Sequence, residues 1–73
     1  MEWKAIAETA DENGKETSWY TKINNHFWWI ELTEKNTYAI TQGIYTRQYK
    51  TLIECKSLAS AKRWVTQNYR KHE

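Results

Sequence analysis

The hydrophobic pattern of the sequence changes once, near Ser57, and this change constrains the fold more than any other feature. Before it, stretches rich in Trp, Tyr, Ile and Thr, which are favoured in strands, alternate with polar turn sequences. After it, apolar residues recur at the three- and four-residue spacing of one helical face: Leu58, Ala61, Val65 and Tyr69. The sequence therefore predicts an α+β domain, an antiparallel β-meander of four to five strands followed by one C-terminal helix packed on one face.

Turn sequences divide the strand region. Asn13-Gly14 is a favoured two-residue type I′ hairpin turn because both central residues need a positive φ, and Asn24-Asn25 is a weaker example. Gln42-Gly43 predicts a further turn or a bulge. The strands are expected between these turns, at 3–10, 17–23, 26–33 and 37–41, with extended stretches of undetermined register at 44–49 and 51–55.

The predicted helix, at about residues 57–71, can cover only one side of this sheet. Ser57 is a typical N-cap residue, and Arg70 and Lys71 lie in the last turn, where positive charge is favourable. A helix of about 15 residues is about 22 Å long, which is enough for one face of a small sheet.

Counting residues from the two asparagine turns assigns the strand residues to two faces. Two-residue loops would place Trp19 opposite Ile30 and Ile6 opposite Thr21. The more aliphatic face, which we call the helix face, is expected to pack against the helix and carries Ile6, Trp19, Ile23, Trp28, Ile30 and Leu32. The other, which we call the open face, is expected to carry Trp3, Tyr20, Lys22, Phe27 and Trp29.

The rings on the open face have two interpretations. A large exposed apolar patch usually marks an interaction surface. Alternatively, the later strands fold back and bury the rings, because small sheets twist strongly and large rings supply much of a small core. A slip of one residue in register would also exchange the two faces.

The charges are unevenly distributed along the chain. The net charge is only +2, which is weak for a nucleic-acid-binding protein. Basic residues that could contact phosphates nevertheless concentrate in the second half, at Arg47, Lys62, Arg63, Arg70 and Lys71. An ordinary solvated helix face with favourable C-terminal charges explains the same pattern.

Groups suited to catalysis or metal binding are few. His26 has no carboxylate or nucleophile near it in sequence, and Cys55, although followed by Lys56, is most simply a small buried residue. One cysteine excludes an internal disulfide or a thiolate zinc cage, and no phosphate-binding or metal-binding motif occurs. We therefore predict a protein that is not an enzyme and has no catalytic residue, metal or cofactor.

The 73 residues predict one domain, residues 1–73, with no second core. The longest apolar run, 27–30, is too short to cross a membrane, and the first residues lack the apolar stretch of a signal peptide. We therefore expect no membrane partner and a cytoplasmic location.

Trp28-Trp29 in a middle strand, followed by a helix that opens with the sequence from Leu58 to Trp64, resembles the DNA-binding domain of phage-type integrases. That domain consists of a three-stranded sheet and a helix, and its sheet enters the major groove. The resemblance implies that Lys22 and Arg47 contact DNA, although this sequence has additional extended stretches and a neutral first half. Its composition also resembles small phage and prophage proteins of low-GC bacteria.

Two functions from different classes follow. In the first, the open face binds a protein, either a partner or a second copy of the chain, with rings at the centre and polar residues at the rim. In the second, Tyr20, Phe27 and Trp29 stack on bases while basic residues bind phosphates. The near-neutral charge favours the protein interface.

Overall fold

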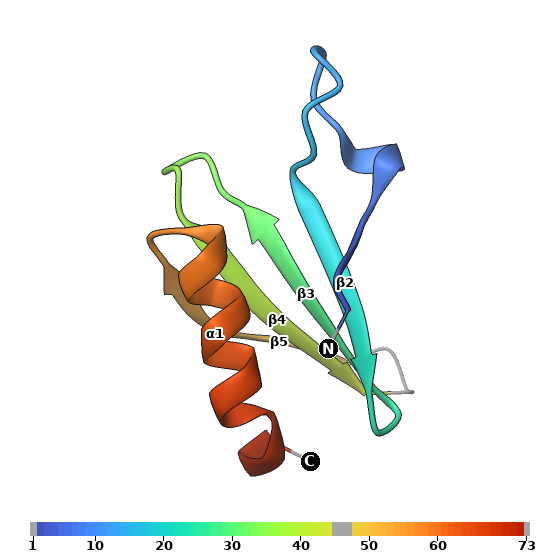
Figure 1. Cartoon of the computed structure of the whole chain (residues 1–73), viewed down its shortest axis with the longest axis vertical. Coiled ribbons are helices and arrows are strands. Elements are labelled where there is room, and N and C mark those ends of the chain that lie inside the picture. The colour runs from blue at the N-terminus through green and yellow to red at the C-terminus, as the bar shows by residue number, and fades with distance from the viewer. Residues whose placement is uncertain (1, 45–47, 73) are drawn as a thin grey trace.

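The structure, a computed structural model, describes residues 2–44 and 48–72. It contains one antiparallel sheet whose strands pair in sequence order (Figure 1). The elements are β1 (Lys4–Ala5), β2 (Ser18–Ile23), β3 (His26–Leu32), β4 (Tyr38–Ile44), β5 (Gln48–Cys55) and the helix α1 (Leu58–Asn68), with 3-10 turns η1 (Ala7–Thr9) and η2 (Tyr69–His72). The predicted α+β meander with a C-terminal helix is confirmed.

The β2–β3 hairpin has the predicted register. Asn24 and Asn25 form the two-residue loop with φ angles of 48° and 69°, both in the left-handed region that asparagine tolerates. Trp19 lies opposite Ile30, and Thr21 lies opposite Trp28. The turn therefore fixes which side of the sheet each ring of this hairpin occupies.

The predicted register of the first strand is wrong. Asn13-Gly14 does not close a two-residue hairpin, because the Asp11 carboxylate accepts hydrogen bonds from the backbone N–H groups of Asn13 and Lys15, both at 2.9 Å. These bonds form a local turn around Gly14, whose φ is 75°, well away from the sheet. The strand is consequently two residues long, and the 7–16 segment projects beyond the sheet (Figure 1).

This slip exchanges the two sides of the first strand. Ala5, rather than Glu8, lies opposite Trp19. Trp3, expected on the open face, instead packs against the core on the helix face. Ile6, expected on the helix face, lines a hollow on the open face. The register differs by three residues from the expected one, and an odd shift exchanges the faces because strand side chains alternate between them.

The expectation of a turn or bulge at Gln42-Gly43 is also wrong. Both residues lie inside β4, where Gly43 pairs with Phe27 of β3. The register shift occurs nearby, between Ile40 and Thr41, where Leu52 is the additional residue on β5. A cross-strand aromatic residue such as Phe27 can shield a strand glycine, which allows β4 to continue through Gly43.

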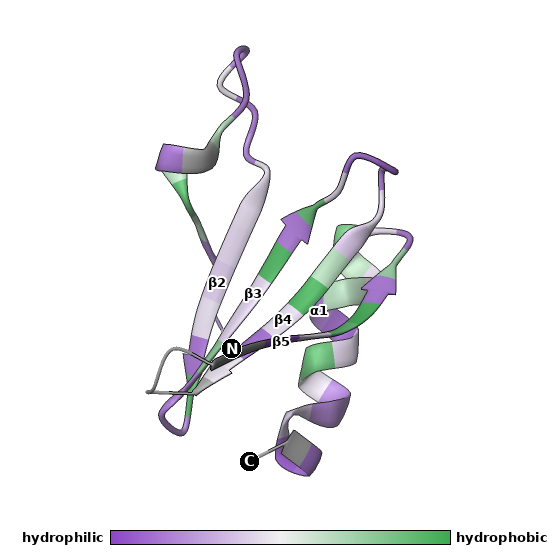
Figure 2. Cartoon of the chain, turned by 180° about the vertical axis from the view of Figure 1, so that it is seen from behind, coloured by the Kyte–Doolittle hydropathy of each residue, from purple (hydrophilic) through white to green (hydrophobic). Residues whose placement is uncertain are grey.

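The core lies between the helix face and α1. Its most buried side chains are Trp28, Ile30, Ile40, Ala61 and Val65, of which Trp28 is 1% exposed and the others 0%. Seen from behind, the sheet lies in front of α1 (Figure 2). Burial of the larger apolar side chains is worth about 1.5–3 kcal/mol each, so these contacts hold the helix to the sheet.

The helix begins as predicted. The Ser57 hydroxyl oxygen accepts a hydrogen bond from the Ser60 N–H at 3.1 Å, which caps the first turn. The predicted helical face is confirmed, since α1 contacts β3, β4 and β5 and buries Ala61 and Val65. Within the described ranges, no helix is long and apolar enough to cross a membrane.

Candidate interaction face

The open face is organised in three rows that run across the strands. The first row contains Ser18, Glu31, Ala39 and Glu54, in order from β2 to β5. The middle row contains Lys4, Tyr20, Trp29, Thr41 and Thr51, from β1 to β5. The third row contains Lys22, Phe27 and Gly43, from β2 to β4. The rings therefore occupy the middle and third rows.

The aromatic side chains of this face contact one another. The rings of Phe27 and Trp29 are stacked, with centroids 5.7 Å apart and an interplanar angle of 21°. Tyr20 lies directly opposite Trp29 on the neighbouring strand. All three side chains are partly exposed, although α1 covers the other side of the sheet. The structure thus brings together Tyr20, Phe27 and Trp29, as the sequence predicts.

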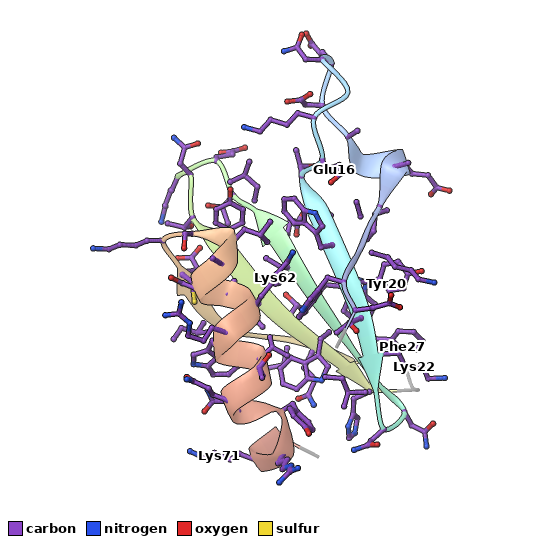
Figure 3. All side chains as sticks on the ribbon, in the orientation of Figure 1. Glu16, Tyr20, Lys22, Phe27, Lys62 and Lys71 are labelled. Atoms are coloured by element: carbon purple, nitrogen blue, oxygen red, sulfur yellow. The ribbon has the colours of Figure 1, made fainter. Side chains whose placement is uncertain are left out.

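Lys22 belongs to the same cluster. Its Nζ lies 5.5 Å from the centroid of the Phe27 ring, within the range of a cation–π contact. Figure 3 shows Tyr20, Lys22 and Phe27 gathered on β2 and β3, away from the helix. The exposed lysine places a positive charge beside the rings, so this part of the face is amphipathic.

A hollow of about 210 Å³ lies beside Trp29. Its lining includes Ile6, Ser18, Glu31 and Thr41. It is open to solvent and combines an aliphatic side chain with hydroxyl and carboxylate groups. A partner's side chain can be anchored in a depression of this kind.

The charged residues of the face separate by sign. Glu31 and Glu54 are exposed in the first row, and Lys22 is exposed in the third. Glu16, also exposed, precedes β2 at the end of the sheet away from Lys22 (Figure 3). Strand residues rise about 3.3 Å each, so the four positions from Ser18 to Lys22 separate the acidic and basic rows by about 13 Å.

The basic residues predicted as phosphate contacts lie elsewhere. Lys62 is partly buried and Arg63 is exposed on α1, while Arg70 and Lys71 are exposed on η2. The helix lies against the opposite side of the sheet, and Tyr69, whose hydroxyl accepts a hydrogen bond from Arg70, lines a hollow together with Lys22. Arg47 lies outside the described residues.

His26 and Cys55 lie at opposite ends of the sheet. His26 begins β3, whereas Cys55 ends β5 beside Tyr38, which pairs with Leu32 at the end of β3. Six positions of β3 span about 20 Å. Cys55 packs against the core, and burial raises the pKa of its thiol. No group of three or more His, Cys, Asp or Glu side chains suited to a metal occurs in the described part of the chain.

Sequence reasoning missed two contributors to this face. Ile6 is expected on the helix face from an incorrect hairpin and Lys4 is assigned to neither face, whereas the structure places Lys4 opposite Tyr20 and Ile6 beside the hollow. The signal for the correct register was Asp11, whose side chain can accept hydrogen bonds two and four residues ahead.

Comparison of the chain with protein-family models, curated proteins and solved structures finds no match. The likeness to the integrase DNA-binding domain stays a prediction. The function must therefore be argued from the open face itself.

Proposed function

We propose that the chain is a non-enzymatic protein-interaction domain that binds through its open face. One observation carries the proposal: Tyr20, Phe27 and Trp29 form a contiguous, partly exposed cluster on the sheet face opposite α1. Exposed apolar clusters of this kind are costly to keep in water, and they usually serve recognition.

The composition of the face supports a protein partner. Aromatic rings dominate the binding energy of protein interfaces, and polar residues commonly surround them. Four charged residues surround the rings here: Lys4, Lys22, Glu31 and Glu54. The hollow beside Trp29 can accommodate an anchoring side chain of the partner. This arrangement corresponds to an apolar centre with a charged rim.

Nucleic acid is the second candidate, favoured by the Lys22 ammonium group above the Phe27 ring. Sheet aromatics that stack on bases, with cations beside them for phosphates, are typical of single-strand binding. Two features oppose it. Glu31 and Glu54 would repel phosphates, and Arg63 is exposed on α1, which packs on the opposite side of the sheet.

Catalysis is the least supported class. The roughly 20 Å between the strand ends that carry His26 and Cys55 keeps a base and a nucleophile apart. The raised pKa of the Cys55 thiol keeps the sulfur protonated at neutral pH, which disfavours a nucleophilic role.

Photo-crosslinking tests the proposal. Benzoylphenylalanine in place of Tyr20 should yield protein adducts in cells, whereas the same group at the exposed helix position Gln67 should not. The variant Trp29→Thr, which keeps a strand-favouring residue, should remove the Tyr20 adducts while the thermal unfolding transition stays cooperative.

The opposing outcomes are equally specific. Adducts from Gln67 but not from Tyr20 would place the binding surface on the helix. A titration with single- and double-stranded oligonucleotides, followed by tryptophan fluorescence at two salt concentrations, tests the second candidate. Tight oligonucleotide binding that weakens steeply with salt would contradict the protein interface and support a nucleic-acid interface.

A further inference from the structure

From the charge pattern of the open face, we infer that its partner is a second copy of this chain, bound face to face about a twofold axis. The inference rests on the proposed function and adds the identity and orientation of the partner. The feature that carries it is the order of the three rows: acidic, aromatic, basic.

This order is self-complementary under one twofold operation. An axis in the plane between two facing sheets, running across the strands along the middle row, exchanges the first and third rows. Lys22 of each copy then faces the first row of the other, where Glu31 lies on the adjoining strand. Both ends of the interface therefore pair opposite charges.

The same operation brings the middle rows together. Trp29 and Tyr20 of one copy face the same residues of the other, because the axis passes along their row. Facing sheets lie about 10 Å apart, a separation that side chains of this size can fill from both sides. The aromatic cluster thus becomes the centre of the interface, with charged pairs at its two ends.

The surface area of the isolated chain fits this arrangement. Its accessible surface is 5508 Å², whereas a folded monomer of 8.8 kDa exposes about 4800 Å². The isolated chain therefore exposes about 700 Å² more than an average monomer of its mass. The projecting 7–16 segment and the uncovered sheet face both contribute to this excess.

Charge also favours a second copy over a polyanion. The charged strand residues of the open face are Lys4, Lys22, Glu31 and Glu54, two of each sign. The inverted copy pairs Lys22 with Glu31 at both ends and sets only Lys4 against its own like charge at the edge strand, whereas the acidic row opposes a uniformly negative partner.

Charge reversal provides the test. Lys22→Glu alone sets Glu against Glu31 of the second copy, and Glu31→Lys alone sets Lys against Lys22. Each single variant should lower the dimer association constant at least tenfold, because the repelling pair occurs twice. An equimolar mixture of the two variants should restore the dimer, since both pairs in the mixed dimer are again opposite in charge.

Sedimentation velocity of the wild-type chain, each variant and the mixture measures these states. Arg63→Glu, on the exposed side of α1, is the matched control and should remain dimeric. A wild-type chain that stays monomeric up to about 1 mM would overturn the inference, as would a mixture that does not restore the dimer.

The test separates this inference from the proposed function. If the wild-type chain is monomeric and the group at Tyr20 crosslinks to another protein, the open face is an interface but its partner is not a second copy. If Trp29→Thr weakens the dimer but mixing the two charge variants does not restore their association, the open face is still the interface and the proposed twofold arrangement is wrong. A dimer that Trp29→Thr does not weaken contradicts the inference, and it contradicts the proposed function as well if Tyr20 yields no protein adduct.

Discussion

Trp28 and Trp29 are consecutive residues of β3 in opposite environments, and replacing each by alanine tests the assignment of the two faces. Trp28 is 1% exposed, and its ring centroid lies 6.4 Å from that of Trp64 on the helix. Trp29 is partly exposed beside the open hollow and stacks on Phe27. The same substitution at adjacent positions changes strand propensity by similar amounts, so the difference reports the environment.

The expected magnitudes follow from this geometry. Trp28→Ala removes a fully buried ring and leaves a cavity enclosed by the sheet and α1, at a cost of about 3–5 kcal/mol. Trp29→Ala leaves a space that opens to water, so the cavity contribution is absent and we expect a loss of about 1–2 kcal/mol. A domain of 73 residues has a total stability of about 4–11 kcal/mol, so only the first change brings it close to unfolding.

Urea unfolding followed by far-UV circular dichroism measures both losses without depending on tryptophan fluorescence. The comparison is best made with Lys22→Glu also present, because we expect that variant to be monomeric and association would otherwise add to the apparent stability. Unchanged m-values would show that each variant unfolds in one step. Equal losses for Trp28→Ala and Trp29→Ala in the monomer would refute the assignment, since they would require Trp29 to be enclosed as well.

Three further predictions concern the turns, the helix cap and the thiol. Ser57→Ala removes the hydrogen bond from the Ser60 N–H and should lower the free energy of unfolding by about 1 kcal/mol in urea titrations, whereas Ser57→Asp should retain most of it. Asn25→Ala should cost about 1–2 kcal/mol because its φ is 69°, and Asn25→Gly should leave the melting temperature equal or higher. Burial raises the pKa of the Cys55 thiol, so the unfolded chain loses the thiol proton at a lower pH than the folded chain. The free energy of unfolding should therefore fall as the pH rises above the ordinary thiol pKa of about 8.5. Cys55→Ala should remove this fall in melting curves measured at several pH values.

The parts of the fold that could be predicted are those that local chemistry determines. Asn24-Asn25 gives a two-residue loop, and this turn alone fixes the register of the six β2–β3 residue pairs. The change to helical spacing after Cys55 likewise locates α1, and the Ser57 hydroxyl marks its start. In these cases one or two residues with strong conformational preferences decide the structure.

The N-terminal register could not be predicted because two local signals compete. Asn13-Gly14 favours a tight hairpin, whereas the Asp11 side chain hydrogen-bonds to the backbone across the same residues and forms a separate turn. The Asp11 turn shifts the register of the first strand by three residues and transfers Trp3 from the open face to the core. Gly43 shows a similar limit, since its place within β4 depends on pairing with Phe27, sixteen residues earlier.

The candidate site was predictable to the extent that it lies on the β2–β3 hairpin. Tyr20, Lys22, Phe27 and Trp29 all follow from that register. The sequence also predicts that the helix covers the more aliphatic face, but how its basic side chains lie relative to the rings required the three-dimensional structure. The order of charges across the rows also depends on β4 and β5, whose pairing includes a register shift.

The simple order of the sheet has a consequence for how the chain folds. Every strand pairs with its neighbour in sequence, and two residues separate β5 from α1. Contacts between near neighbours close short loops, which lowers the entropy cost of forming them and speeds folding. During synthesis the strands emerge before α1, so Trp19 and Trp28 stay uncovered until Ala61 and Val65 are made. The last elements of the chain therefore protect the nascent sheet from aggregation, whereas the rings on its other face stay accessible in the finished domain.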